Sequence, residues 1–331
     1  MDRIIGQARA LYALEGYELD PVRGHKGGRN LILTCRRDGK EEYVLRVSAA
    51  GDRREEDYLA ETEFVRYLAR NGAPVADVVP SVRGRLVERA EADGKEAFLS
   101  LFARAKGMLM CENGYRYREG VPLEEYFYNT GKALGAVHRL SRQYRPAHRR
   151  PDFFDQYNMD HIGRLIPDGY AELKQAIARR LEAYRALPAD GAAYGLVHFD
   201  FCDGNYHVDM DTGKITVFDF DNCLYCWYMF DLAHVWTHGV GWYRHLADPA
   251  ERRKGMKHYF DTVLEGYRSE TDVPAELLEQ LPLFIDMTII ENVVDEFGCA
   301  AREGGLPDEE DIGDLAECLV KDVPWAGFFA E

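Results

Sequence analysis

The chain has 331 residues, 46% of them hydrophobic and 30% charged, with a formal net charge of −16 at pH 7. This length predicts about two globular domains, and the negative charge argues against nucleic acids and anionic membrane surfaces as partners. No apolar run approaches the roughly 20 residues of a membrane span. The N-terminus lacks a signal-peptide pattern, and seven cysteines without a regular framework suit a reducing compartment. We therefore expect a cytoplasmic protein.

The first hundred residues predict a small β-rich lobe. Residues 1–16 have the pattern of a short amphipathic helix. Residues 31–35 and 43–47 alternate like two strands joined by a polar turn. Residues 55–72 predict a helix that ends at a glycine. More strands follow around the turn sequence ADGK, and the last of them covers 98–103.

Three glycines precede the first of these strands, at Gly24, Gly27 and Gly28. A glycine-rich loop can cover phosphates with its backbone N–H groups. The P-loop pattern G-x-x-x-x-G-K-[ST] is absent, and a simple hairpin turn is the alternative interpretation.

The remaining residues predict a larger helical lobe. Residues 108–128 are aromatic and irregular, which suits either the wall of a ligand pocket or a loop packed on the surface. Helical patterns follow at 129–142, within 151–188, and at 236–247, 251–269, 275–299 and 308–320, with the last four separated by prolines. Without repeats or a low-complexity linker, we expect the two parts, an N-terminal lobe (1–103) and a C-terminal lobe (104–331), to form one compact α+β unit.

The most informative segment is 195–233, GLVHFDFCDGNYHVDMDTGKITVFDFDNCLYCWYMFDLA. Its pattern predicts a loop, a strand, a turn, a second strand and a second loop. A tight hairpin brings the loop before its first strand near the loop after its second. Asp200 and Asn205 on the first loop and Asp219 on the second are therefore expected to converge.

Two carboxylates and a carboxamide at the mouth of a hairpin suit chemistry with a hard cation. Mg²⁺ takes oxygen ligands and is usually held by one or two carboxylates together with substrate phosphates. Phosphoryl transfer then needs a further carboxylate that orients the attacking hydroxyl. The alternative is an ordinary surface hairpin, because Asn and Asp favour turns. A functional site is favoured by the joint spacing of five polar residues: His198, Asp200, Asn205, Asp219 and Asp221.

The motifs of this segment resemble those of the aminoglycoside phosphotransferase family, which includes choline and homoserine kinases. The matching words are His198-Phe199-Asp200 through Asn205, Asp219-Phe220-Asp221, and Asp231-Leu232-Ala233. The surrounding residues look closest to the branch of stress-response kinase A, the RdoA-like kinases. The resemblance implies a protein-kinase-like two-lobe fold, ATP and Mg²⁺ as cofactors, and transfer to a hydroxyl group.

For the N-terminal lobe, the resemblance implies a nucleotide site. Gly27 and Gly28 would belong to the phosphate-covering loop, and Arg46 stands where kinases usually carry a lysine that grips the phosphates. Glu61 would pair with Arg46, although Glu56 and Glu63 are rivals on the same helix. The backbone at Phe102, Ala103 and Arg104 would meet the adenine.

For the C-terminal lobe, the resemblance implies the catalytic and metal-binding residues. Asp200 would orient the acceptor hydroxyl, while Asn205 and Asp219 would hold Mg²⁺. Asp221 would be either a second metal ligand or a brace of its loop. The supporting residues would be His198, which braces the catalytic loop, and Asp231, which anchors it.

The acceptor is not identified by the sequence. One hypothesis is a small-molecule kinase whose acceptor is an amino alcohol, a sugar, a homoserine-like metabolite or an aminoglycoside-like compound. The alternatives are a Ser/Thr protein kinase of the stress-response type and a nucleotide-binding pseudokinase that serves as an interaction module. The oligomeric state is also left open.

Overall fold

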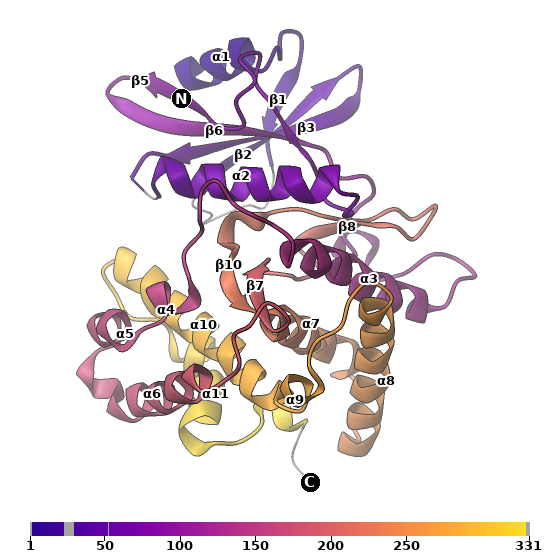
Figure 1. The fold of residues 1–331 in the computed structure, drawn as a ribbon, viewed down its shortest axis with the longest axis vertical. Coiled ribbons are helices and arrows are strands. Elements are labelled where there is room, and N and C mark those ends of the chain that lie inside the picture. Colours follow the sequence, from indigo (N-terminus) through magenta and orange to yellow (C-terminus); the bar gives the residue numbers. More distant parts are fainter. Residues whose placement is uncertain (1, 23–29, 52, 329–331) are drawn as a thin grey trace. The chain divides into compact units, whose positions relative to one another are not determined.

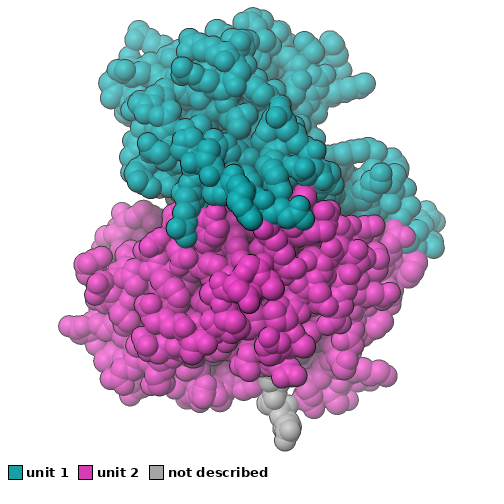
Figure 2. Space-filling view, viewed as in Figure 1, with its two compact units in different colours: residues 1–121, 143–150, 204–222 teal, residues 122–142, 151–203, 223–331 magenta. Residues whose placement is uncertain are grey.

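The computed structural model describes residues 2–22, 30–51 and 53–328. The chain packs into two compact units (Figure 2). Unit 1 comprises 1–121, 143–150 and 204–222, and unit 2 comprises 122–142, 151–203 and 223–331. The expected boundary at residue 103 separates a lobe with the phosphate-covering loop from a lobe with the acceptor site. This functional division stays a prediction. By packing, the chain forms two units and not the single compact unit expected, and residues 204–222, which contain the predicted hairpin, belong to unit 1.

Unit 1 is built on a six-stranded antiparallel sheet with strand order β1-β2-β3-β6-β4, in which β5 also pairs with β6 (Figure 1). Its strands are β1 (Glu18–Pro21), β2 (Asn30–Arg37), β3 (Lys40–Ala49), β4 (Val78–Val79), β5 (Glu88–Ala92) and β6 (Lys95–Ala103). The strands predicted at 31–35, 43–47 and 98–103 are confirmed as parts of β2, β3 and β6.

Two helices cover opposite faces of this sheet, α1 (Asp2–Leu11) and α2 (Glu55–Arg70) (Figure 1). The α1 face is an apolar core that includes Leu45 and Val47 of β3. Because side chains alternate along a strand, Arg46 between them points to the other face, where α2 lies. The charged side chain of Arg46 is therefore buried between β3 and α2.

The predicted hairpin is also part of unit 1. Its strands, β8 (Tyr206–Val208) and β9 (Ile215–Val217), pair antiparallel. The turn between them is closed by a hydrogen bond of 2.7 Å from the N–H of Gly213 to the carbonyl of Asp209. The hairpin joins the rest of the unit through backbone bridges from Val75 to Val217 and from Met108 to Val208.

Unit 2 is mainly helical. Its helices are α3 (Leu123–Ser141), α4 (Phe153–Gln156), α5 (Met159–Leu165), α6 (Ala171–Arg185), α7 (Tyr228–Tyr243), α8 (Pro249–Arg268), α9 (Ala275–Leu278), α10 (Leu281–Arg302) and α11 (Glu309–Lys321). The helices α3 and α8 approach closely through small residues, because a Cβ added to Gly131 would lie 1.8 Å from the carbonyl oxygen of Val263. Among the described residues, no helix combines the length and the apolar character needed to cross a membrane.

Three helix predictions need correction. The helix expected at 129–142 is α3, which begins at Leu123, within the segment expected to be irregular. The helix expected at 236–247 begins earlier, at Tyr228. Its first residues were missed because residues 228–236 are buried on all sides and lack the amphipathic periodicity of a surface helix. The helix expected at 275–299 is divided into α9 and α10. Pro282 lies in the first turn of α10, where its missing N–H costs nothing, and it cannot continue a preceding helix.

A short antiparallel pair in unit 2 leads to the predicted catalytic loop. Strand β7 (Tyr194–Val197) pairs with β10 (Leu224–Trp227). The loop begins at His198 directly after β7, and α7 begins directly after β10. This arrangement fixes the start of the loop beside the first turn of α7, which carries Asp231.

Candidate active site

One cavity of about 1090 Å³ lies entirely within unit 1. Its walls come from the α2-facing side chains of the sheet, namely Ile32, Thr34, Val44, Arg46 and Phe102, and from the hairpin with its flanking loops, namely Gly204, Asn205, His207, Phe218 and Asp219. Cavities of 300–1,000 Å³ are typical of small-molecule and cofactor sites. This cavity is therefore large enough for a nucleotide.

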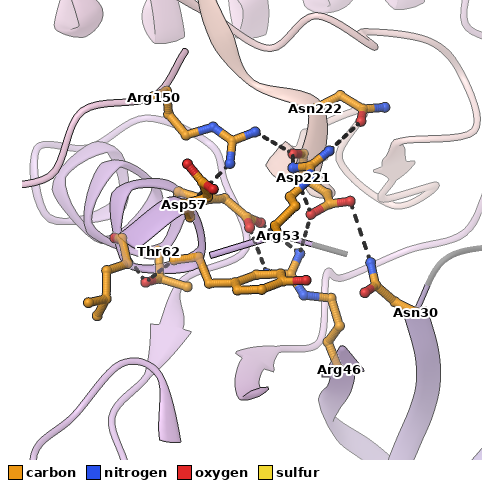
Figure 3. A network of polar contacts seen from close by, with 11 residues as sticks. Asn30, Arg46, Arg53, Asp57, Thr62, Arg150, Asp221 and Asn222 are labelled. Carbon is orange, nitrogen blue, oxygen red and sulfur yellow. Dashed lines mark hydrogen bonds and ion pairs between the residues drawn. The ribbon is translucent and has the colours of Figure 1, made fainter. Parts of the chain in front are cut away.

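The cation of this cavity, Arg46, is held by Glu61 of α2 (Figure 3 shows the surrounding network). The Nη1 and Nη2 atoms of Arg46 donate to Oε1 and Oε2 of Glu61 at 2.8 and 2.6 Å. Only 4% of Arg46 and none of Glu61 is exposed. Burial disfavours the charged arginine, but the charge and hydrogen bonds of Glu61, together with the charges of Asp221 and Asp219, outweigh that effect and raise the pKa of Arg46.

Of the three acids left open on this helix, Glu61 is the one that binds Arg46. Glu56 is exposed. Glu63 pairs with His148, at 2.9 Å from Oε1 to Nδ1. Helical periodicity alone could not separate the three, because the choice depends on the face that meets β3.

Asn205 and Asp219 lie at the mouth of the hairpin and line the same cavity. The N–H of Phe218 donates to the carbonyl of Asn205 at 2.9 Å, which ties the two loops together. Asp219 is exposed and has a φ of +63°, a left-handed conformation that Asp tolerates better than most residues. Burial, the largest effect on the pKa of Arg46, lowers it. The negative charge of Asp219 also raises this pKa, by less than Glu61 and Asp221 do.

The residues expected to meet the adenine, Phe102, Ala103 and Arg104, line the cavity. The N–H groups of Ala103 and Arg104 donate to the carbonyls of Asp77 and Glu42 at 2.8 and 2.9 Å. These two donors are therefore committed inside the protein. Recognition of a base by this segment would then depend on carbonyl groups and on Ala105, which lines the same cavity.

Two predicted cofactor residues, Gly27 and Gly28, lie outside the described residues. Among the residues that are described, no group of three or more His, Cys, Asp or Glu side chains could hold a metal ion. A cation at Asn205 and Asp219 would therefore take further ligands from elsewhere, and phosphate oxygens are the usual partners of such an incomplete set.

In unit 2, the predicted catalytic loop is fixed by a buried carboxylate. Asp231 accepts hydrogen bonds from the N–H groups of His198 and Phe199, at 2.8 and 2.9 Å. It also binds Nε2 of His138 at 3.0 Å. The Nδ1 atom of His198 accepts from the N–H of Asp200 at 3.3 Å. These contacts tie the start of the loop to α7, and the roles of His198 as a brace and Asp231 as an anchor of a catalytic loop stay predictions.

Asp200 is half-buried on this loop, directly after Phe199, whose φ is +67°. The ring of Phe199 stacks on Phe230 of α7, with centroids 4.1 Å apart and an interplanar angle of 8°. A left-handed backbone costs a non-glycine residue roughly 1–2 kcal/mol. The hydrogen bonds to Asp231 and the ring stack stabilise this conformation. They thereby fix the backbone from which the side chain of the next residue, Asp200, extends.

The structure places a further acid, Glu291 of α10, within the electrostatic reach of Asp200. Burial raises the pKa of Glu291 well above its ordinary value, and the carboxylates of Asp295 and Asp200 raise it further. Asp295 is one helical turn along α10, on the same face. Glu291 was not among the predicted site residues, because the acids of α10 form no recognisable motif.

The chain resembles known phosphotransferases over most of its length. Residues 28–270 match the model of a family described as the phosphotransferase enzyme family, APH. Amicoumacin kinase of Bacillus subtilis (strain 168) is 29% identical over 290 residues, which cover 86% of this chain and 81% of that protein.

Solved structures show the same fold. Amicoumacin kinase hAmiN, in complex with AMP-PNP, Ca²⁺ and Ami, superimposes with a TM-score of 0.80 and 22% identity, covering 98% of this chain and 94% of that one. A microcompartment-associated aminopropanol kinase gives a TM-score of 0.68 and 21% identity, covering 96% and 94%. These likenesses confirm the predicted α+β, kinase-like fold.

Proposed function

Because the chain belongs to the phosphotransferase enzyme family, and is thus an enzyme that transfers a phosphoryl group to an alcohol group, we propose that it moves the γ-phosphate of ATP to a small molecule that also carries an amine. Membership confirms the family resemblance drawn from the motifs of residues 198–233. The closer likeness to the stress-response branch stays a prediction.

One observation carries the nucleotide half of the proposal: a single cavity of unit 1 is lined by Arg46, Asn205 and Asp219. Arg46 would grip the phosphates, since its buried charge is fixed by Glu61. Asn205 and Asp219 would hold Mg²⁺, whose chemistry is to neutralise the charge on the phosphates. The solved relative hAmiN is in complex with AMP-PNP and Ca²⁺, which supports a nucleotide and a divalent cation as cofactors here.

The acceptor half of the proposal rests on Asp200. Its carboxylate would accept the proton of the acceptor hydroxyl as the oxygen of that group forms a bond to the γ-phosphorus. The bond from the γ-phosphorus to the bridging oxygen then breaks, and ADP leaves with that electron pair. Phosphoryl transfer depends mostly on positioning and charge, so an aspartate fixed by its loop is sufficient as a base.

The amine is suggested by the acids near Asp200. Burial raises the pKa of Glu291, and the charges of Asp295 and Asp200 raise it further, whereas a cation bound beside these acids lowers it. An ammonium group near Glu291 is therefore attracted by the negative charge of Asp200 and Asp295. The names of the relatives, amicoumacin kinase and aminopropanol kinase, are consistent with this class of acceptor.

The test is an assay of ADP release across matched acceptors. Amino alcohols and aminoglycosides are compared with their N-acetylated forms and with Ser-containing peptides. We expect turnover with the free amines and a KM at least tenfold higher for the acetylated forms. Equal turnover and KM for the free and the acetylated acceptors would contradict the proposal that an amine is recognised. A preference for peptides would establish the protein-kinase alternative.

A matched pair of variants locates the effect on α10. Glu291→Gln should raise the KM for amine acceptors and leave the KM for ATP unchanged, because no residue of the nucleotide cavity is altered. Glu296→Gln removes an exposed acid of the same helix and should leave both constants unchanged. Equal effects of the two substitutions would mean that the charge of the whole helix, and no specific site, is responsible.

A further inference from the structure

Asp221 is the centre of a buried polar network in unit 1 (Figure 3). Its side chain is 9% exposed. Its Oδ1 lies 3.2 Å from Nη1 of Arg53 and 3.7 Å from Nη1 of Arg46, and its Oδ2 accepts from Nδ2 of Asn30 at 3.4 Å. Its carbonyl accepts from Arg53 and, at 2.7 Å, from Nη2 of Arg150.

These partners give Asp221 a different character from Asp219, two residues before it. The carboxylate of Asp219 is exposed on the cavity, whereas that of Asp221 faces two arginines and an amide. A carboxylate that is already neutralised by two guanidinium groups attracts a divalent cation weakly, because the cation would be repelled by both arginines at short range. The contacts of Asp221 are those of a residue that orders other protein groups.

The group that Asp221 orders is Arg46. Glu61 takes one N–H from each terminal nitrogen of Arg46, and Asp221 lies on the Nη1 side. The guanidinium packs against the rings of Phe102 and Tyr58, with its carbon 5.2 and 5.7 Å from the ring centroids. Two carboxylates and two rings thus fix the plane of a side chain that otherwise has many rotamers.

A further donor of Arg46 is its Nε, which is buried and has no hydrogen-bond partner among the described residues. An unpaired buried N–H is costly, and Arg46 lines the nucleotide cavity. Nε is therefore a donor left for a phosphate oxygen, and its direction depends on the groups that hold the two terminal nitrogens.

We propose that Asp221 is a positioning residue that holds Arg46 so that its Nε meets the phosphates, and that Asp221 is not a ligand of the metal. This inference rests on the proposed function. It explains how arginine serves at a position where kinases usually carry lysine: a second acid fixes the larger and flatter side chain.

The experiment compares the affinity for ATP with Mg²⁺ and without it, in excess chelator, by calorimetric titration. Asp221→Asn should weaken ATP binding by roughly tenfold in both conditions, because the misplaced group is Arg46. Asp219→Asn should weaken binding only when Mg²⁺ is present. If Asp221→Asn also weakens binding only with Mg²⁺, Asp221 is a metal ligand and the inference is wrong.

A double-mutant cycle adds a readout that a merely structural role would not change. In an Arg46→Lys background, Asp221→Asn should have little further effect on ATP affinity, because the group that Asp221 positions is already gone. Additive losses would overturn the inference. Asn222→Ala is the matched control, since Asn222 also binds Arg53, at 3.2 Å, and this substitution should leave ATP affinity unchanged.

Two further arms keep the outcome decisive. If Asp221→Asn does not fold, Asn30→Ala removes the amide partner of Oδ2 and should give a smaller loss that is again independent of Mg²⁺; a loss seen only with Mg²⁺ would contradict the inference. If the wild-type protein binds no nucleotide in either condition, the proposed function fails, and this result is distinct from binding in which Asp221 acts with the metal.

Discussion

Asp231→Asn is the substitution whose consequences follow most directly from the structure. Asp231 is fully buried and accepts from the N–H groups of His198 and Phe199 and from His138. Burial alone would raise its pKa, but the hydrogen bonds from His138 and from the backbone of His198, together with nearby positive charge, outweigh burial and hold the pKa below its ordinary value. An amide in this place keeps one acceptor and turns an NH₂ group toward a donor.

The size of the effect can be estimated from these contacts. A hydrogen bond to a charged group contributes about 1.5–3 kcal/mol, and the substitution weakens or removes three such bonds. Burial lowers the pKa of His138, so its contact with Asp231 counts as a hydrogen bond and not as an ion pair. We therefore expect Asp231→Asn to lower the free energy of unfolding by about 4 kcal/mol. For a chain of this length, that corresponds to a Tm lower by roughly 6 °C.

The assay is thermal unfolding followed by circular dichroism, together with kinetics at a temperature where the variant is folded. Turnover should fall at least a hundredfold, because the loop that carries Asp200 loses its anchor, whereas ATP affinity should change little. Asp261→Asn is the control, since its ion pair with Lys257 is exposed and contributes at most a few tenths of a kcal/mol. Wild-type Tm and turnover in Asp231→Asn would refute this account of the loop.

Three more predictions follow. Asp200→Ala should reduce turnover by about 10²–10⁴-fold in the ADP-release assay while calorimetric ATP affinity survives; lost affinity would mean that its role is assigned wrongly. Arg46→Lys should raise the KM for ATP roughly tenfold, because lysine keeps the charge and loses the bidentate contact with Glu61, and normal kinetics of Arg46→Ala would place the phosphate grip elsewhere. The raised pKa of Glu291 means that the native state retains a proton that the unfolded state releases above about 4.5, so stability falls as pH rises through that window. Glu291→Gln should therefore raise the Tm at pH 8 and leave it unchanged at pH 4, and an equal shift at both values would contradict the burial of this acid.

The local elements of the site could be predicted because they are encoded over short distances. The hairpin of β8 and β9 was expected from alternation and a glycine turn, and the turn closes at Gly213. Arg46 was placed on a strand and Glu61 on a helix by periodicity alone. Both patterns act within 20 residues, where spacing along the chain determines which side chains share a face.

The network around Asp221 could not be predicted in the same way. Arg53 and Arg150 reach it across 168 and 71 positions of the sequence, and such contacts depend on how a loop and the segment 143–150 pack. Neither arginine belongs to a motif. For the same reason the sequence left open whether Asp221 holds a metal, because the answer depends on the charges that surround it in the folded unit.

The most direct test of the central claim is calorimetric titration of Mg-ATP into the wild-type protein and into Asp219→Ala. The account predicts that the wild type binds Mg-ATP, that chelation of Mg²⁺ weakens this binding, and that Asp219→Ala removes the dependence on Mg²⁺. Absence of binding by the wild type, or an unchanged dependence on Mg²⁺ in the variant, would contradict the assignment of the unit 1 cavity as the nucleotide site.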